Sequence, residues 1–119
     1  MNGPYRNLKV WNDSMYLVTK VYEVTSSFPA SEIYGLTNQL RRAVVSIASN
    51  IAEGYGRSSN KDLVHFLYVS LGSSNELDTQ IQIAYNLKYV TYESFKEIDV
   101  LNESINKMLH SLIYTREHL

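Results

Sequence analysis

The chain has 119 residues, of which 45% are hydrophobic and 19% charged, a composition typical of one globular domain covering residues 1–119. It contains no cysteine, which excludes a disulfide framework and a thiolate metal site. No apolar run reaches the roughly 20 residues that span a bilayer, and the first residues lack the apolar core of a signal peptide. We therefore expect a cytoplasmic protein that does not contact membranes.

The charges are nearly balanced but unevenly distributed. The whole chain carries 11 basic and 12 acidic side chains, for a net charge of −1. Residues 1–61 hold seven basic and four acidic groups, whereas residues 62–119 hold four basic and eight acidic groups. This balance excludes a uniformly basic nucleic-acid binder, although one face can still be basic.

Residues 8–25 are predicted to form the first helix. Side chains recur there at spacings of three and four, which is the repeat of one helical seam. The residue before Pro29 is driven out of helical geometry, so the helix ends upstream of it. The predicted seam comprises Leu8, Trp11, Met15, Val18, Tyr22 and Thr25.

A second helix is predicted over residues 35–54, and its apolar arc is unusually wide. The arc covers roughly 200°, about twice the width that one bundle seam requires. It either packs on two sister helices or extends over a subunit interface, and we favour the interface. The arc comprises Leu36, Leu40, Ala43, Val44, Val45, Ile47, Ala48, Ile51 and Ala52.

The third predicted helix spans residues 59–87. Gly54 is expected to end the preceding helix in a left-handed conformation, and Ser59 is expected to cap the new one. Gly72 lies in its interior, where glycine costs about 1 kcal/mol relative to alanine, so we expect a close helix or subunit contact there. A second apolar stripe on the far side comprises Val69, Ile83 and Leu87.

The fourth predicted helix spans residues 92–115, with Thr91 as its N-cap. Its seam includes Phe95, Ile98, Ile105 and Leu109. Four helices joined by short turns predict an all-α, antiparallel up-down-up-down four-helix bundle.

The sequence gives no pattern for catalysis, metal or a cofactor, and we expect none of them. No glutamate is followed three residues later by histidine, the motif of di-iron bundles. No serine lies in a Gly-x-Ser-x-Gly turn. The turn at residues 54–57 lacks the Gly-Lys-Ser/Thr ending of a phosphate loop and follows a helix rather than a strand.

Four basic residues surround the second predicted helix and the turn after it, and they are candidates for phosphate contacts with RNA or DNA. The alternative is that salt bridges neutralise them, for example between Arg57 and Asp62. Arg41 falls inside the apolar arc, where burial would demand a carboxylate such as Glu76. The candidates are Arg41, Arg42, Arg57 and Lys61.

A further set of residues is predicted to pack against neighbouring subunits. Most are apolar or small and lie on the second sides of the second and third helices, and Asn50 is a polar group beside the apolar arc, where it can specify register or oligomeric state. The candidates are Val45, Asn50, Ala52, Val69, Gly72, Ile83 and Leu87.

One stretch of the chain resembles a known family. The pattern is Gln39-Leu40-Arg41-Arg42-Ala43, Ser46-Ile47, Asn50-Ile51-Ala52-Glu53-Gly54 and Gly56-Arg57, continuing through Phe66-Leu67-Tyr68, Ser70, Gly72-Ser73 and Glu76-Leu77 to Thr79-Gln80. It resembles the four-helix bundle proteins encoded in intervening sequences of bacterial 23S rRNA genes. Accessory proteins of diversity-generating retroelements are similar.

The resemblance implies a homo-oligomer, specifically a ring-like homopentamer that engages nucleic acid and a protein partner such as a reverse transcriptase. Two functions of different classes follow from the sequence. In the first, the oligomer is a non-enzymatic accessory or adaptor protein that binds RNA or DNA through its basic residues. In the second, it is a protein–protein scaffold whose basic residues form salt bridges.

Overall fold

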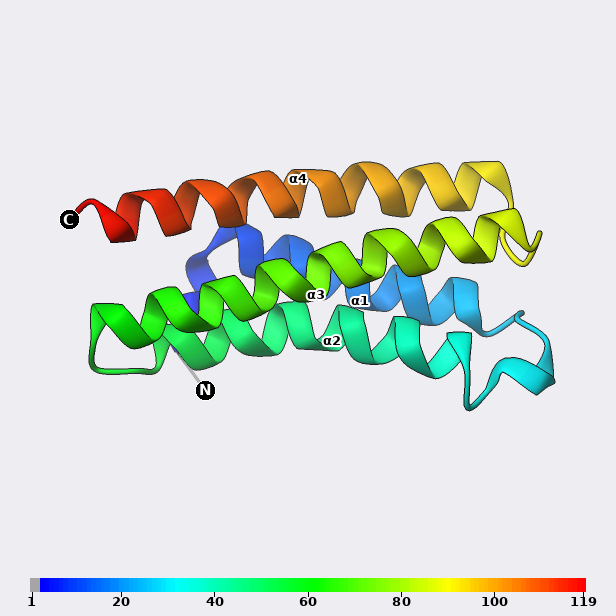
Figure 1. Cartoon of the computed structure of the whole chain (residues 1–119), viewed down its shortest axis with the longest axis horizontal. Helices are drawn as coiled ribbons and strands as arrows, with labels where there is room; N and C mark the ends of the chain where they lie inside the picture. Colours follow the sequence, from blue (N-terminus) through cyan, green and yellow to red (C-terminus); the bar gives the residue numbers. More distant parts are fainter. Residues whose placement is uncertain (1–2) are drawn as a thin grey trace.

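The computed structural model describes residues 3–119. This part of the chain folds into four long antiparallel helices (Figure 1). Each helix packs on its neighbour in sequence, and α1 also packs on α4, which closes the bundle. The bundle measures 45 × 25 × 21 Å. The predicted up-down-up-down bundle is therefore confirmed. Its elements are η1 (Pro4–Asn7), α1 (Lys9–Thr25), η2 (Ala30–Glu32), α2 (Leu36–Tyr55), α3 (Asn60–Asn86) and α4 (Tyr92–Glu117).

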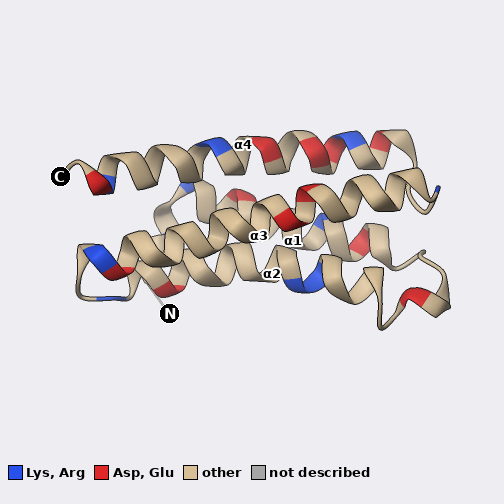
Figure 2. Cartoon of the chain, viewed as in Figure 1, with Lys and Arg blue, Asp and Glu red and all other residues tan. Residues whose placement is uncertain are grey.

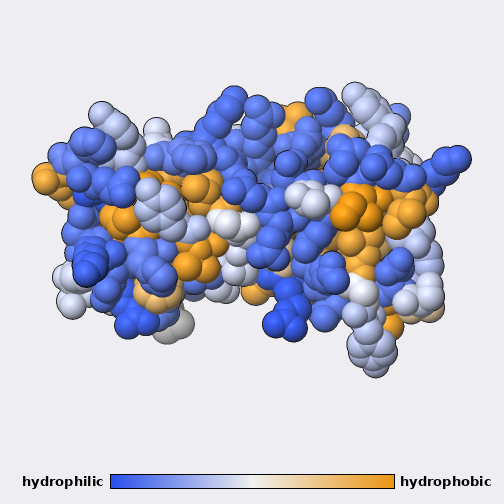
Figure 3. All heavy atoms as spheres, viewed as in Figure 1, coloured by the Kyte–Doolittle hydropathy of each residue, from blue (hydrophilic) through white to orange (hydrophobic). Residues whose placement is uncertain are grey.

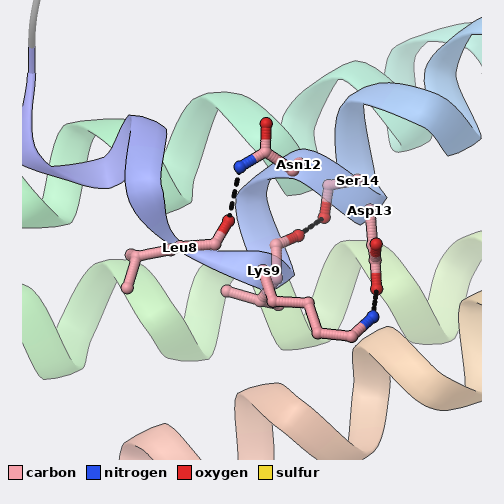
Figure 4. A network of polar contacts seen from close by, with 6 residues as sticks. Leu8, Lys9, Asn12, Asp13 and Ser14 are labelled. Atoms are coloured by element: carbon pink, nitrogen blue, oxygen red, sulfur yellow. Dashed lines mark hydrogen bonds and ion pairs between the residues drawn. The ribbon is translucent and has the colours of Figure 1, made fainter.

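The start of α1 is held by local polar contacts (Figure 4). Nδ2 of Asn12 donates to the carbonyl oxygen of Leu8 at 3.0 Å, and Lys9 pairs with Asp13 at 2.6 Å. Oγ of Ser14 donates to the carbonyl oxygen of Val10 at 2.7 Å. This last bond satisfies the hydroxyl within its own helix, so Ser14 is fully buried at little cost.

The buried seam of α1 differs from the predicted one by a rotation of the helix. Met15 and Tyr22 are exposed, and Trp11 and Val18 are only partly buried. Sequence alone misassigned the seam because Ser14, a polar residue, lies in its middle. The residues that enter the core are Val10, Ser14, Leu17, Val21 and Thr25.

The junction between α2 and α3 is tight at Gly54. The helix continues through Gly54 to Tyr55, and no glycine in residues 3–119 has a positive φ, so the expected left-handed ending is wrong. A Cβ on Gly54 would lie 3.0 Å from Leu63 Cδ1 and 3.0 Å from Phe66 Cβ. The glycine therefore permits close packing of α2 on α3 rather than an unusual backbone conformation.

The predicted caps of α3 and α4 are confirmed. Oγ of Ser59 accepts from the amide of Asp62 at 3.1 Å, and Oγ1 of Thr91 accepts from the amide of Ser94 at 3.2 Å. Within residues 3–119, no helix is both long and apolar enough to cross a lipid bilayer.

Candidate nucleic-acid and subunit interfaces

The four candidate basic residues form two separate pairs. Arg41 and Arg42 lie in the first half of α2, whereas Arg57 follows the end of α2 and Lys61 lies in the first turn of α3. Sixteen residues separate Arg41 from Arg57, which corresponds to about 24 Å along a helix. Figure 2 shows basic residues on α2 well apart from those at the α2–α3 turn. The structure therefore does not bring the four together into one site.

Arg41 is held by α1 rather than by a carboxylate. Its Nε donates to Oγ1 of Thr25 at 2.9 Å, and its Nη2 approaches the carbonyl oxygen of Tyr22 at 3.5 Å. Its guanidinium carbon lies 4.5 Å from the centre of the Tyr22 ring. The expected Glu76 pairing is therefore wrong, because a hydroxyl, a carbonyl and an aromatic face satisfy the cation instead.

Arg42 is exposed and forms no ion pair with the described part of the chain. It lines an open hollow of about 560 Å³ formed by α2 and Tyr22 of α1. We name this hollow the Arg41–Arg42 groove, and its lining comprises Tyr22, Asn38, Arg41, Arg42, Val45, Ser46, Ser49 and Asn50. It combines positive charge with an aromatic ring, as sites for single-stranded nucleic acid do.

At the other end of α2, the charge of Arg57 is offset by a neighbour. Its Nη2 lies 2.6 Å from Oε1 of Glu53, one helical turn earlier, and its guanidinium carbon lies 4.9 Å from the centre of the Phe66 ring. The expected Asp62 pairing is wrong, because Glu53, one turn earlier on the same side of α2, pairs with Arg57 instead. Lys61 is exposed.

A second, more polar groove of about 450 Å³ runs between α2 and α3. We name it the α2–α3 groove, and it is lined by Asn38, Arg42 and Ser46 of α2 and by Ser73, Glu76 and Gln80 of α3. Nδ2 of Asn50 donates to Oγ of Ser46 at 2.9 Å, and Oγ of Ser73 donates to the same oxygen at 2.8 Å. Asn50 therefore belongs to a hydrogen-bonded chain that joins the two helices.

The candidate packing residues of α3 form an exposed apolar stripe beside this groove. Val69, Ile83 and Leu87 are 38%, 42% and 50% exposed. Figure 3 shows hydrophobic residues in two patches on this face of the molecule, with hydrophilic residues between them. We name the stripe together with the α2–α3 groove the α2–α3 outer face.

The other candidates lie on different sides of their helices. Val45 is exposed in the Arg41–Arg42 groove, and Ala52, two helical turns later, is half-buried. Gly72 is exposed, and a Cβ placed on it would meet nothing within 4 Å. The expectation of a close helix contact at Gly72 is therefore wrong within the chain, because the small residues that face inward are Ser70, Ser73 and Ser74.

The sequence predicts a single helical turn over residues 29–34, which η2 confirms, but it does not indicate the contacts of this turn. Glu32 accepts a hydrogen bond from the amide of Leu36 at 3.1 Å and one from the hydroxyl of Tyr89 at 3.0 Å. The hydrogen bond to Glu32, together with burial, raises the pKa of Tyr89. Tyr34, in the same turn, is 93% exposed.

An acidic groove of about 420 Å³ lies between α3 and α4 and is lined by Asp78, Asp99 and Glu103 among others. Three carboxylates around one groove are typical of a cation site, but these three are spread along α3 and α4. In residues 3–119, no group of three histidine, cysteine, aspartate or glutamate residues is arranged to hold a metal ion.

Residues 6–111 match the family of 23S rRNA-intervening sequence proteins. The chain belongs to this family. The match covers α1, α2 and α3 completely and most of α4, so it includes all four basic candidates and the whole α2–α3 outer face.

The bundle also resembles a solved structure. That structure is described as a protein with unknown function from the S23 ribosomal protein family of Bacteroides thetaiotaomicron VPI-5482. The two proteins are 24% identical, the match covers 87% of this chain and 97% of the other, and the TM-score is 0.79. At this identity the likeness shows a shared fold. No curated protein matches the chain.

Proposed function

We propose that this 23S rRNA-intervening sequence protein is a non-enzymatic adaptor that forms a homo-oligomer through its α2–α3 outer face. The observation that carries the proposal is the exposure of Val69, Ile83 and Leu87 on one side of α3. Apolar patches rimmed by polar groups typically mark contacts between proteins. Their burial in a subunit interface removes this surface from water.

The centre of the same face favours a specific contact over loose aggregation. Arg42 and Glu76 carry opposite charges in the α2–α3 groove, and neither forms an ion pair with residues 3–119. A neighbouring copy that presents the opposite charges can pair with both. Gly72 leaves open space beside them, where a neighbouring backbone can approach closely.

The test is the dissociation constant of the oligomer, measured by sedimentation equilibrium for the wild type and for Ile83→Glu with Leu87→Glu. We expect the double variant to remain folded and to be monomeric at concentrations where the wild type associates. The matched control is Val100→Glu on α4, since Val100 is 53% exposed but lies outside the outer face. Equal association of the wild type and the double variant would reject this interface.

A second candidate function is binding of RNA or DNA, with Arg42 contacting a phosphate instead of a neighbouring subunit. The Arg41–Arg42 groove supports it, because Arg42 forms no ion pair with residues 3–119 and the Tyr22 ring lies beside Arg41. The resemblance to retroelement accessory proteins also supports it, and it suggests a ring-like pentamer that engages a reverse transcriptase. Repetition of the groove around an oligomer would compensate for the near-neutral charge of one chain.

This candidate is tested by the salt dependence of binding to fluorescent structured RNA and duplex DNA. Each phosphate contact contributes about 0.7 to 0.9 to the slope of log K against log salt. Arg42→Gln should reduce this slope, whereas Lys96→Gln, at an exposed position on α4, should leave it unchanged. If the wild-type oligomer binds neither RNA nor DNA at low salt, nucleic-acid binding is rejected and the protein adaptor remains the proposed function.

A further inference from the structure

The surface between α1 and α4, on the side of the bundle opposite the α2–α3 outer face, is hollowed along most of its length. One hollow of about 830 Å³ and another of about 400 Å³ are both lined by Lys9, and we name them together the α1–α4 groove. On α4 the groove extends from Tyr92 to Leu112, twenty residues apart, which corresponds to about 30 Å along a helix. It is therefore long enough to hold a helix of about 20 residues.

The lining of this groove exposes apolar and aromatic surface. Tyr16, Tyr92 and Val100 are 54%, 55% and 53% exposed. The Tyr92 ring is supported from the core, because it lies 6.0 Å from the ring of Tyr85, which in turn stacks on Phe95 at 4.7 Å. A tyrosine fixed in this way loses little conformational entropy on binding. The partly buried apolar side chains of the lining are Leu8, Leu101, Met108 and Leu112.

The charges around the groove are balanced. The two hollows together are lined by three amines and three carboxylates. Lys9 pairs with Asp13 at 2.6 Å. Glu97 of α4 pairs with Lys20 of α1 at 3.0 Å, so the chain itself neutralises much of this rim. A polyanion would meet as many carboxylates as amines here, and the complement of the groove is an apolar ridge with balanced charges on its flanks.

We propose that the α1–α4 groove docks an amphipathic helix of a different protein, about 20 residues long and nearly neutral. A groove between two antiparallel helices accepts a third helix by the ridge-into-groove packing found inside bundles. Apolar side chains three and four residues apart on the partner would fill the two hollows and cover Tyr16, Tyr92 and Val100. This surface gives the proposed adaptor a place for a protein other than itself.

A second copy of this chain does not supply the occupant. Each of the four long helices already buries its apolar ridge in the core of its own bundle. The exposed stripe of α3 is interrupted, since fourteen residues separate Val69 from Ile83. Two α1–α4 grooves placed face to face would leave their hollows unfilled. The inference therefore does not depend on self-association through the α2–α3 outer face.

The test uses a fluorescent helical peptide of about 20 residues, with leucines along one face and equal numbers of glutamates and lysines on the other. Fluorescence anisotropy should show saturable binding to the full-length protein, and the affinity should change less than about threefold between low and physiological salt, because the rim is neutral. Val100→Glu should weaken binding at least about tenfold, since it places a charge beneath the bound helix. Ile83→Glu with Leu87→Glu, on the α2–α3 outer face, is the matched control and should leave peptide binding unchanged.

A second peptide of the same composition, with its leucines spread around the helix, should bind at least about tenfold more weakly. Thermal unfolding should show nearly the same melting temperature for Val100→Glu and the wild type, because the position is exposed. The inference is overturned if the amphipathic peptide does not bind, if the two peptides bind equally, or if Val100→Glu has no effect. Weaker self-association of Val100→Glu would assign the groove to a second copy and also overturn it. A monomeric wild type that binds the peptide would refute self-association and support this inference.

Discussion

Ser74 and Asn102 form a reciprocal hydrogen-bonded pair inside the bundle. Oγ of Ser74 donates to Oδ1 of Asn102 at 2.8 Å, and Nδ2 of Asn102 donates to the carbonyl oxygen of Ser74 at 3.0 Å. Both residues are buried, and the pair joins α3 to α4. Because apolar burial is non-directional whereas hydrogen bonds are directional, a satisfied polar pair at this height favours one register of the two helices.

Replacement of Asn102 by alanine should therefore destabilise the fold. It leaves a cavity and removes the acceptor of the Ser74 hydroxyl, which keeps only the bond that Asn106 donates to it at 3.1 Å. The free energy of unfolding should fall by about 1–3 kcal/mol. Urea denaturation followed by circular dichroism measures this difference. Asn75→Ala, at an exposed position that also contacts Asn106, is the control and should change stability by less than about 0.5 kcal/mol. Equal effects of the two substitutions would contradict the register role.

Gly54 and Gly72 should respond in opposite ways to alanine. At Gly54 the added methyl would meet Leu63 and Phe66 at 3.0 Å, and overpacking of this kind costs about 1–3 kcal/mol. At Gly72 nothing lies within 4 Å, so the higher helix propensity of alanine should stabilise the monomer by up to about 1 kcal/mol. Urea unfolding of dilute samples compares the two. A stabilised Gly54→Ala variant would show that the α2–α3 contact is looser than described.

The Tyr89–Glu32 hydrogen bond should make stability depend on alkaline pH. The hydrogen bond that the Tyr89 hydroxyl donates to Glu32 is the larger cause, and burial is the next; both raise the pKa of Tyr89 above its usual value near 10. The folded state thus retains the phenol proton more strongly than the unfolded state does. The resulting stabilisation is fully present below about pH 10 and is lost as pH rises through the raised pKa.

Tyr89→Phe isolates this contribution. The unfolding free energy of the wild type should exceed that of the variant at neutral pH, and the difference should shrink above about pH 10. Tyr68, whose pKa is also raised by burial and by Glu117, is present in both proteins and cancels in the comparison. A difference that stays constant from neutral to strongly alkaline pH would refute the hydrogen bond.

Substitution of the adjacent residues Arg41 and Arg42 should affect the stability of the fold to different extents. Arg41→Ala should lower stability by about 1 kcal/mol, because it removes the bond to Thr25 and the contact with the Tyr22 ring. Arg42→Ala should change monomer stability by less than about 0.5 kcal/mol, since Arg42 has no ion pair to lose within the described chain. Thermal unfolding of both variants measures this. A larger loss of stability for Arg42→Ala than for Arg41→Ala would contradict this assignment.

The wide apolar arc of α2 and the helix caps could be read from the sequence because they depend on local periodicity and local hydrogen bonds. Leu40, Ile47 and Ile51 are fully buried as predicted. The seam of α1 could not be read in the same way. Thr25 is buried as predicted, but Ser14 enters the core because its hydroxyl donates to a carbonyl oxygen one turn earlier, which a hydrophobic pattern does not reveal.

The candidate site was predicted less well, because its chemistry depends on which side chains meet across helices. The sequence placed Arg41 near Glu76 of α3, whereas the structure places it against Thr25 and Tyr22 of α1. It also placed Arg57 near Asp62, although Glu53 lies on the same side of α2 one turn earlier. Oligomeric state and binding remain predictions, since both depend on surfaces outside one chain.

The most direct test of the proposed adaptor is the molar mass of the wild-type protein, measured by light scattering over a wide concentration range. The chain has a mass of 13.7 kDa. If the α2–α3 outer face is a subunit interface, the mass should reach a defined multiple of this value and fall towards it on dilution. A mass that stays at 13.7 kDa at all concentrations would contradict the proposal.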